Sequence, residues 1–143
     1  MQKLQFEIPE NCKMAHFIIR GQFPTLNEYL AACGRNPKAG GRLKREYMEN
    51  ASWEIRSQLR NYHTDNRIIL HYLIYEQNMK RDKDNVFCMI SKCVSDALQV
   101  CKVIDNDGWK NVENFTHDFF VDKDNPRIEV YIEEITDEMP ILR

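Results

Sequence analysis

The feature that most constrains the fold is an apolar run at residues 67–77, which no glycine or proline interrupts. Its sequence, RIILHYLIYEQ, is rich in the β-branched and aromatic residues that favour strands. It is the strongest strand candidate in the chain, and we expect it at the centre of a sheet. Mixed α/β sheets usually place their sites just past the carboxyl ends of such strands. The residues after 77 are therefore the first place to look for function.

Other segments carry patterns that complete a fold. Apolar residues recur at helical spacing from Val86 to Cys101, which predicts a helix packed by one face. Thr25 and Glu28 have the spacing of a capping box and predict a short helix to about Cys33. The other expected elements are a helix at 43–62 and strands at 15–20, 112–121 and 127–135, with a turn at 122–126 joining the last two strands as a hairpin.

The resulting order, β-α-α-β-α-β-β, is that of an α+β fold with a small mixed sheet covered by helices. We expect a single domain over residues 1–143, with its core at about 15–135 and an acidic tail at 136–143. A chain of 143 residues is long enough to bury a core. No apolar run approaches membrane length, and the start lacks the apolar region of a signal peptide. We therefore expect a cytoplasmic protein with no membrane partner.

Three aspartates follow the expected central strand and the helix after it. Asp82 and Asp84 are two residues apart, so in an extended segment their carboxylates project to the same side. Asp107 lies beyond the helix, which at roughly 25 Å is too long to bring it beside Asp82 unaided. The sheet and a dimer would have to do so. Carboxylates near Lys92 suit a divalent cation such as Mg²⁺. The alternative is that Asp-x-Asp-Asn after a strand only caps a helix.

Two other kinds of metal site are disfavoured. Residues 105–108 mimic part of a calcium-binding EF-hand loop, but aligning Gly108 with the fixed sixth position puts Val103 first and Asn114 twelfth. Both of those positions should be acidic, so the EF-hand interpretation fails. Five cysteines without a C-x-x-C pair argue against structural zinc and against disulfides. A site of oxygen ligands remains as the metal hypothesis.

A basic segment lies nearer the amino terminus, where we expect a flexible glycine-containing loop at 34–42 before the helix at 43–62. Between Arg35 and Arg60, seven basic residues stand against three acidic ones, a local charge of +4 on a chain whose net charge is −2. Such a segment can contact DNA phosphates, and the alternative is a solvated helix face. The residues expected to contact DNA are Arg35, Lys38, Arg42, Lys44 and Arg45.

Taken in order, these motifs resemble one family. D-x-D-N at 82–85, K-x-x-x-D-A-L at 92–98 and I-x-N-D-G-W at 104–109 are similar to the RusA family of Holliday junction resolvases, which are small phage-borne endodeoxyribonucleases. The resemblance covers about residues 15–135 and is sharpest from 81 to 109. F-P-T-L-N-E-Y at 23–29 is similar to the turn that follows the family's first strand.

The resemblance implies a metal-dependent nuclease of DNA recombination and repair. Asp82, Asp84 and Asp107 would bind Mg²⁺, with Mn²⁺ as a substitute, and Lys92 would assist catalysis. A homodimer would place two such sites on a four-way junction, which needs two symmetric nicks. The spacing from Asp84 to Lys92 is about one helical turn longer than the tighter pattern associated with the family's best-known member. Lys80 and Lys83 therefore remain alternatives for the catalytic lysine.

Two other functions stay open. A DNA-binding phage protein could retain the fold without cleavage, and it would bind no Mg²⁺ or Mn²⁺ at millimolar concentration. A nuclease of flaps or other branched DNA would share all the site residues, so the sequence does not separate it from a junction resolvase.

Overall fold

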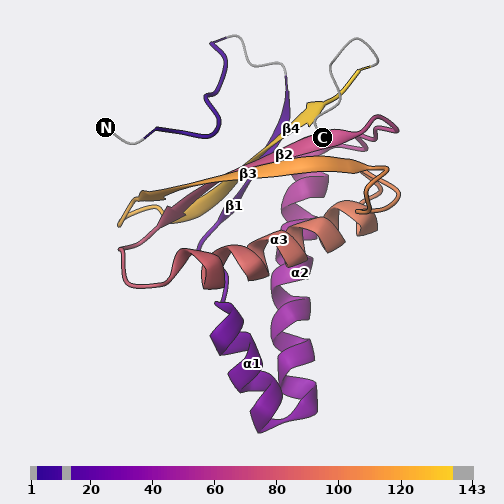
Figure 1. Cartoon of the computed structure of the whole chain (residues 1–143). Helices are drawn as coiled ribbons and strands as arrows, with labels where there is room; N and C mark the ends of the chain where they lie inside the picture. The colour runs from indigo at the N-terminus through magenta and orange to yellow at the C-terminus, as the bar shows by residue number, and fades with distance from the viewer. Residues whose placement is uncertain (1–2, 11–13, 137–143) are drawn as a thin grey trace.

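The computed structural model describes residues 3–10 and 14–136, which form one four-stranded sheet and three helices (Figure 1). The small mixed sheet of an α+β fold is thereby confirmed, with the three helices together on one face (Figure 1). The expected acidic tail falls almost wholly outside the described residues. In chain order the elements are β1 (Ala15–Arg20), α1 (Leu26–Arg35), α2 (Pro37–Leu59), β2 (Ile68–Glu76), α3 (Lys83–Val100), β3 (Val112–Val121) and β4 (Arg127–Glu134).

The strand order β1-β4-β2-β3 confirms β2 as an interior strand and shows that the predicted hairpin is wrong. β4 pairs antiparallel with β1 and β2, whereas β3 pairs in parallel with β2. β2 is buried along almost its whole length, so placing it between two neighbours removes much apolar surface from water. The segment after β3 crosses the end of β2, where the Asp122 N–H donates to the Glu76 carbonyl at 2.8 Å. β3 is left at the edge of the sheet.

The connection between α1 and α2 also differs from the expectation of a flexible loop at 34–42. Asn36 alone separates the two helices, and its side chain accepts a hydrogen bond from the Lys38 N–H at 2.9 Å. Pro37 occupies the first position of α2, where a missing N–H costs nothing. The Asn-Pro pair was the local signal for this helix start. The two helices form a hairpin that projects away from the sheet (Figure 1).

Close packing within this hairpin requires a glycine. A Cβ at Gly40 would collide with the Sγ of Cys33, so any larger residue would push α1 and α2 apart. The basic residues of this region are therefore presented by rigid helices and not by an adaptable loop.

The core lies between the sheet and the helices, with fully buried side chains such as Ile74 of β2, Ile90 of α3 and Ile55 of α2. The opposite face of the sheet is partly covered by the amino-terminal segment, where the Phe6 ring stacks on His71 at a centroid distance of 3.9 Å. Within residues 3–10 and 14–136, no helix has the length and apolar character that crossing a membrane requires.

Candidate active site

Asp82 and Asp84 lie at the start of α3, shortly after the carboxyl end of β2, as the sequence predicted. Asp82 occupies the cap position with an extended backbone, but its carboxylate makes no capping hydrogen bond. The Asp84 carboxylate accepts from the neighbouring Asn85 N–H, at 2.9 Å, and from no other donor within residues 3–10 and 14–136. Both side chains are exposed. Helix capping therefore does not account for Asp82, and both carboxylates are accessible to a ligand.

An ion pair between the half-buried Arg81 and the buried Glu76 fixes the turn that carries these aspartates. Arg81 Nε donates to Glu76 Oε1 at 2.9 Å, and Arg81 Nη2 donates to Glu76 Oε2 at 3.1 Å. Arg81 Nη1 also donates to the Phe23 carbonyl at 2.8 Å, and the Gln22 amide donates to Glu76 Oε2 at 3.0 Å. Glu76 is buried, so water screens this two-point contact weakly. The sequence patterns did not identify Glu76. The available signal was the position of this acidic residue at the end of a strand, with Arg81 five residues later.

Lys92 and Asp107 line one cavity of about 400 Å³ between α3 and the edge strand β3. Lys92 comes from the middle of α3, and Asp107 comes from the loop between α3 and β3. Lys83 lines a second cavity together with Asp84. Two of the candidate lysines thus each share a cavity with a predicted metal ligand: Lys92 with Asp107, and Lys83 with Asp84.

The three aspartates do not meet within one chain. Among the described residues, one group of three His, Cys, Asp or Glu residues has its ligand atoms within 4.8 Å of one another, and it contains none of the three. The 18 residues of α3 rise about 27 Å from its start to its end, and the loop beyond that end brings Asp107 to the cavity that Cys88 and Lys92 also line. Asp82 and Asp84 suit a Mg²⁺ site in which one or two carboxylates share the ion with phosphates and waters.

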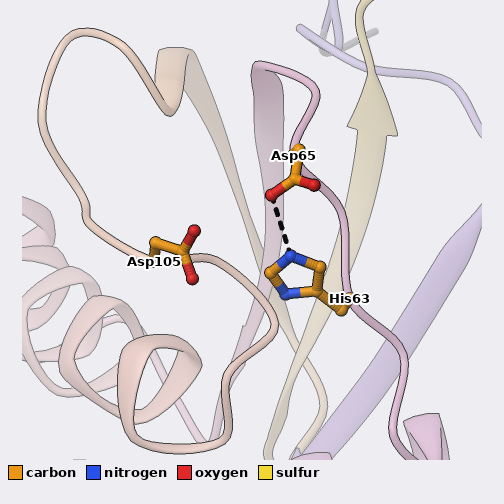
Figure 2. A group of neighbouring side chains, drawn as sticks. All are labelled: His63, Asp65 and Asp105. Carbon is orange, nitrogen blue, oxygen red and sulfur yellow. Dashed lines mark hydrogen bonds and ion pairs between the residues drawn. The ribbon is translucent and has the colours of Figure 1, made fainter.

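The group that does form consists of His63, Asp65 and Asp105, whose side chains converge from the loops after α2 and after α3 (Figure 2). His63 Nε2 lies 2.9 Å from Asp65 Oδ1, and His63 Nδ1 lies 2.7 Å from the Lys102 carbonyl oxygen. The hydrogen bond to Lys102 and then the contact with Asp65 raise the pKa of His63. An imidazolium that donates to both oxygens accounts for this exposed group without an ion. We assign it to joining the two loops.

Sequence patterns did not identify this group. The sequence showed Asp105 only as part of a failed EF-hand alignment. Its two partners lie 40 or more residues away, and the short spacing from His63 to Asp65 was the only signal.

The predicted DNA-contacting residues lie along the α1–α2 hairpin, and four of them are exposed: Arg35, Lys38, Arg42 and Arg45. Lys44 differs, because its Nζ lies 3.0 Å from the Asp96 carboxylate of α3. This hydrogen bond raises the pKa of Lys44. Lys44 also lines the cavity that contains Lys92. It ties α2 to α3 and is less available to DNA than its neighbours.

A scan of known protein families finds no match to this chain, and a search of curated proteins finds none either. The resemblance to the RusA family therefore stays a prediction, which rests on the motifs at 82–85, 92–98 and 104–109.

Proposed function

We propose that this protein is a Mg²⁺-dependent endodeoxyribonuclease that cleaves branched DNA, including four-way junctions, and acts as a homodimer. The observation that carries the proposal is the pair of exposed carboxylates of Asp82 and Asp84. The Asp82 carboxylate makes no helix-capping hydrogen bond, and the ion pair between Glu76 and Arg81 holds the turn on which both aspartates lie. Accessible oxygen ligands on a fixed turn are what a Mg²⁺ site requires.

The chemistry would be hydrolysis of a phosphodiester bond beside this turn. Asp82 and Asp84 would hold the metal ion, which would supply polarisation of the scissile phosphate and activation of the attacking water. Lys92 would stabilise negative charge that develops on the phosphate oxygens. The exposed arginines and Lys38 of the α1–α2 hairpin would hold the DNA arms through their phosphates.

A homodimer is part of the proposal because one chain does not assemble the complete acidic set. In a two-fold dimer, each protomer can offer its Asp107 to the Asp82 and Asp84 of the other. The mass from light scattering at micromolar concentration is expected to be twice the 17.1 kDa of the chain. A mass of one chain, with or without junction DNA, would contradict this part of the proposal.

The deciding experiment compares cleavage of a labelled four-way junction, a flap and a linear duplex, each with Mg²⁺ and with a chelator. We expect nicks near the branch point in the Mg²⁺ reactions and none in the chelated ones. Equal cutting of the linear duplex, or cutting that survives the chelator, would count against a branched-DNA nuclease of this type.

A non-catalytic DNA-binding protein is the second candidate. The separation of Asp107 from Asp82 within one chain favours it, because a binder needs no assembled metal site. Calorimetric titration separates the two candidates. Junction binding without any Mg²⁺ or Mn²⁺ binding at millimolar concentration would support the binder and exclude the nuclease.

A further inference from the structure

Two neighbouring cavities lie along α3 beside the edge strand β3, and we refer to them together as the groove. The first is the 400 Å³ cavity lined by Lys92 and Asp107, and the second, of about 510 Å³, is lined by Lys83 and Asp84. Cys88, in the first third of α3, lines both cavities. The groove therefore contains Asp107 in its first cavity and Asp84 in its second.

Aromatic rings form a row along this groove. Phe115, His117 and Phe119 alternate along β3 and so share one face of the strand, about 6.6 Å apart. Phe87 of α3 bridges the first two, with ring centroids 5.5 Å from Phe115 and 4.5 Å from His117. The Phe115 side chain is 50% exposed, so half of its ring surface is accessible to a ligand. The row therefore offers one exposed ring, Phe115, and two half-buried rings, His117 and Phe119, at a spacing that matches consecutive bases of an extended single strand.

The groove carries charges of both signs, because the exposed Asp84 and Asp107 line it as well, so an anionic ligand would contact it at the lysines. Lys83 and Lys92 line it, and neither forms an ion pair with a carboxylate in residues 3–10 and 14–136. Lys83 Nζ lies 5.6 Å from the centroid of the Phe119 ring. The Asp118 carboxylate, which also lines the groove, already accepts hydrogen bonds from the backbone N–H groups of Gln5 and Phe6. Free ammonium groups beside rings are what nucleotides with exposed bases require.

We infer that this groove binds a short stretch of unpaired nucleotides, with bases stacked on Phe115, His117 and Phe119 and phosphates near Lys83 and Lys92. A paired duplex cannot offer its base faces to these rings, whereas an unpaired strand can. The inference rests on the proposed function and narrows its substrate. Branched DNA with unpaired nucleotides at the branch, such as a flap, is preferred over a fully paired four-way junction.

Fluorescence anisotropy tests this directly with a flap that carries an unpaired thymidine tail and with the same duplex arms without the tail. We expect the wild type to bind the tailed DNA more tightly. Phe115→Ala and His117→Ala should each weaken binding of the tail by about tenfold and leave binding of the duplex unchanged. The matched control is Phe120→Ala, since Phe120 stacks on Tyr75 on the other face of β3. Its tail affinity should equal that of the wild type.

A measurement on the wild type guards against variants that fail to fold. A tail containing 5-iodouracil is photo-cross-linked to the protein, and the modified peptides are identified by mass spectrometry. Cross-links to the groove residues of β3 are expected. Cross-links confined to the α1–α2 hairpin, or equal affinity for DNA with and without the tail, would overturn the inference.

The two proposals fail in different ways. A protein that nicks four-way junctions in Mg²⁺ but gains nothing from an unpaired tail keeps the proposed function and loses this inference. A protein that binds the tail through Phe115 and His117 but cleaves no branched DNA keeps the inference and loses the nuclease.

Discussion

The two ends of α3 carry the two parts of the candidate site, and the protein holds them by different means. At the amino-terminal end, Arg81 contacts the buried Glu76 through two nitrogens and reaches the Phe23 carbonyl with a third. At the carboxyl-terminal end, an exposed histidine, His63, contacts the Lys102 carbonyl and so links two loops. One end is fixed by a buried ion pair and the other by a contact open to solvent.

The difference bears on what each end can do. A buried, two-point ion pair keeps its geometry over a wide range of salt and pH, because guanidinium stays charged and screening is weak. An exposed histidine contact depends on protonation and ionic strength. We therefore expect Asp82 and Asp84 to be preorganised, and the loop of Asp107 to be adjustable, as a residue that completes a site across a dimer would be.

The largest effect should come from the aspartates. Asp82→Asn, Asp84→Asn and Asp107→Asn each remove a negative ligand while keeping side-chain size. Cleavage should fall by more than about 100-fold, the upper end of what loss of an outer-shell partner costs. Junction affinity should hold, because phosphate contacts come from the α1–α2 hairpin. Stability should also hold, since the three carboxylates do not crowd one another within one chain.

The matched control for this series is Asp105→Asn. Asp105 belongs to the exposed group with His63 and Asp65 and does not line either cavity of the groove. Its substitution should change cleavage little. Loss of activity in Asp105→Asn together with an active Asp107→Asn would reverse the assignment of the third aspartate.

Breaking the buried pair should have the next largest effect. Glu76→Ala leaves the Arg81 guanidinium in a largely enclosed position without its carboxylate, which should cost about 3 kcal/mol of unfolding free energy. Urea unfolding measures this. The control is Asp122→Ala, which removes a more exposed partner of Arg127 and should cost less than about 1 kcal/mol. Equal losses in the two variants would mean that the pair does not hold the turn as described.

The basic hairpin should give a smaller and purely electrostatic effect. Arg42→Gln with Arg45→Gln should weaken binding of all DNA sequences and reduce the slope of log affinity against log salt by roughly 2. Lys44→Gln is the informative comparison, because Lys44 is paired with Asp96. It should reduce stability slightly and leave the salt slope nearly unchanged. An unaltered slope in the double arginine variant would remove the hairpin from the DNA interface.

Local patterns were sufficient for the elements but not for their pairing. The strand at 15–20 and the strand at 112–121 have the predicted bounds, since alternation and turn residues are local properties. The strands with which β4 pairs depend on which strand buries the most apolar surface at the centre of the sheet. No pattern within residues 127–135 carries that information.

The same limit applies to the site. Asp82 and Asp84 were found because they adjoin in sequence and follow a strong strand. Glu76 and His63 were missed because their structural roles depend on contacts with distant segments. Glu76 accepts a hydrogen bond from the Gln22 amide, and His63 contacts the Lys102 carbonyl. That Asp107 joins Asp82 and Asp84 stays a prediction, because its position relative to them depends on the loop after α3 and, in the proposed dimer, on a second chain.

The smallest expected effect concerns pH and the adjustable end of α3. The contacts with Lys102 and Asp65 raise the pKa of His63 above its unfolded value of about 6.5. The stabilisation they provide should therefore be complete below the unfolded pKa and should be lost as pH rises through the folded pKa. Urea midpoints of the wild type and His63→Gln, measured from pH 5.5 to 8.5 in chelator, should differ most at the acidic end and converge at the basic end. When both proteins also carry Asp65→Asn, the difference in urea midpoint that His63→Gln causes at the acidic end should be smaller. The reason is that Asp65→Asn removes one of the two acceptors of the imidazolium. Parallel curves for wild type and His63→Gln would show that the charged imidazole does not join the loops, and the contrast between the two ends of α3 would then need another cause.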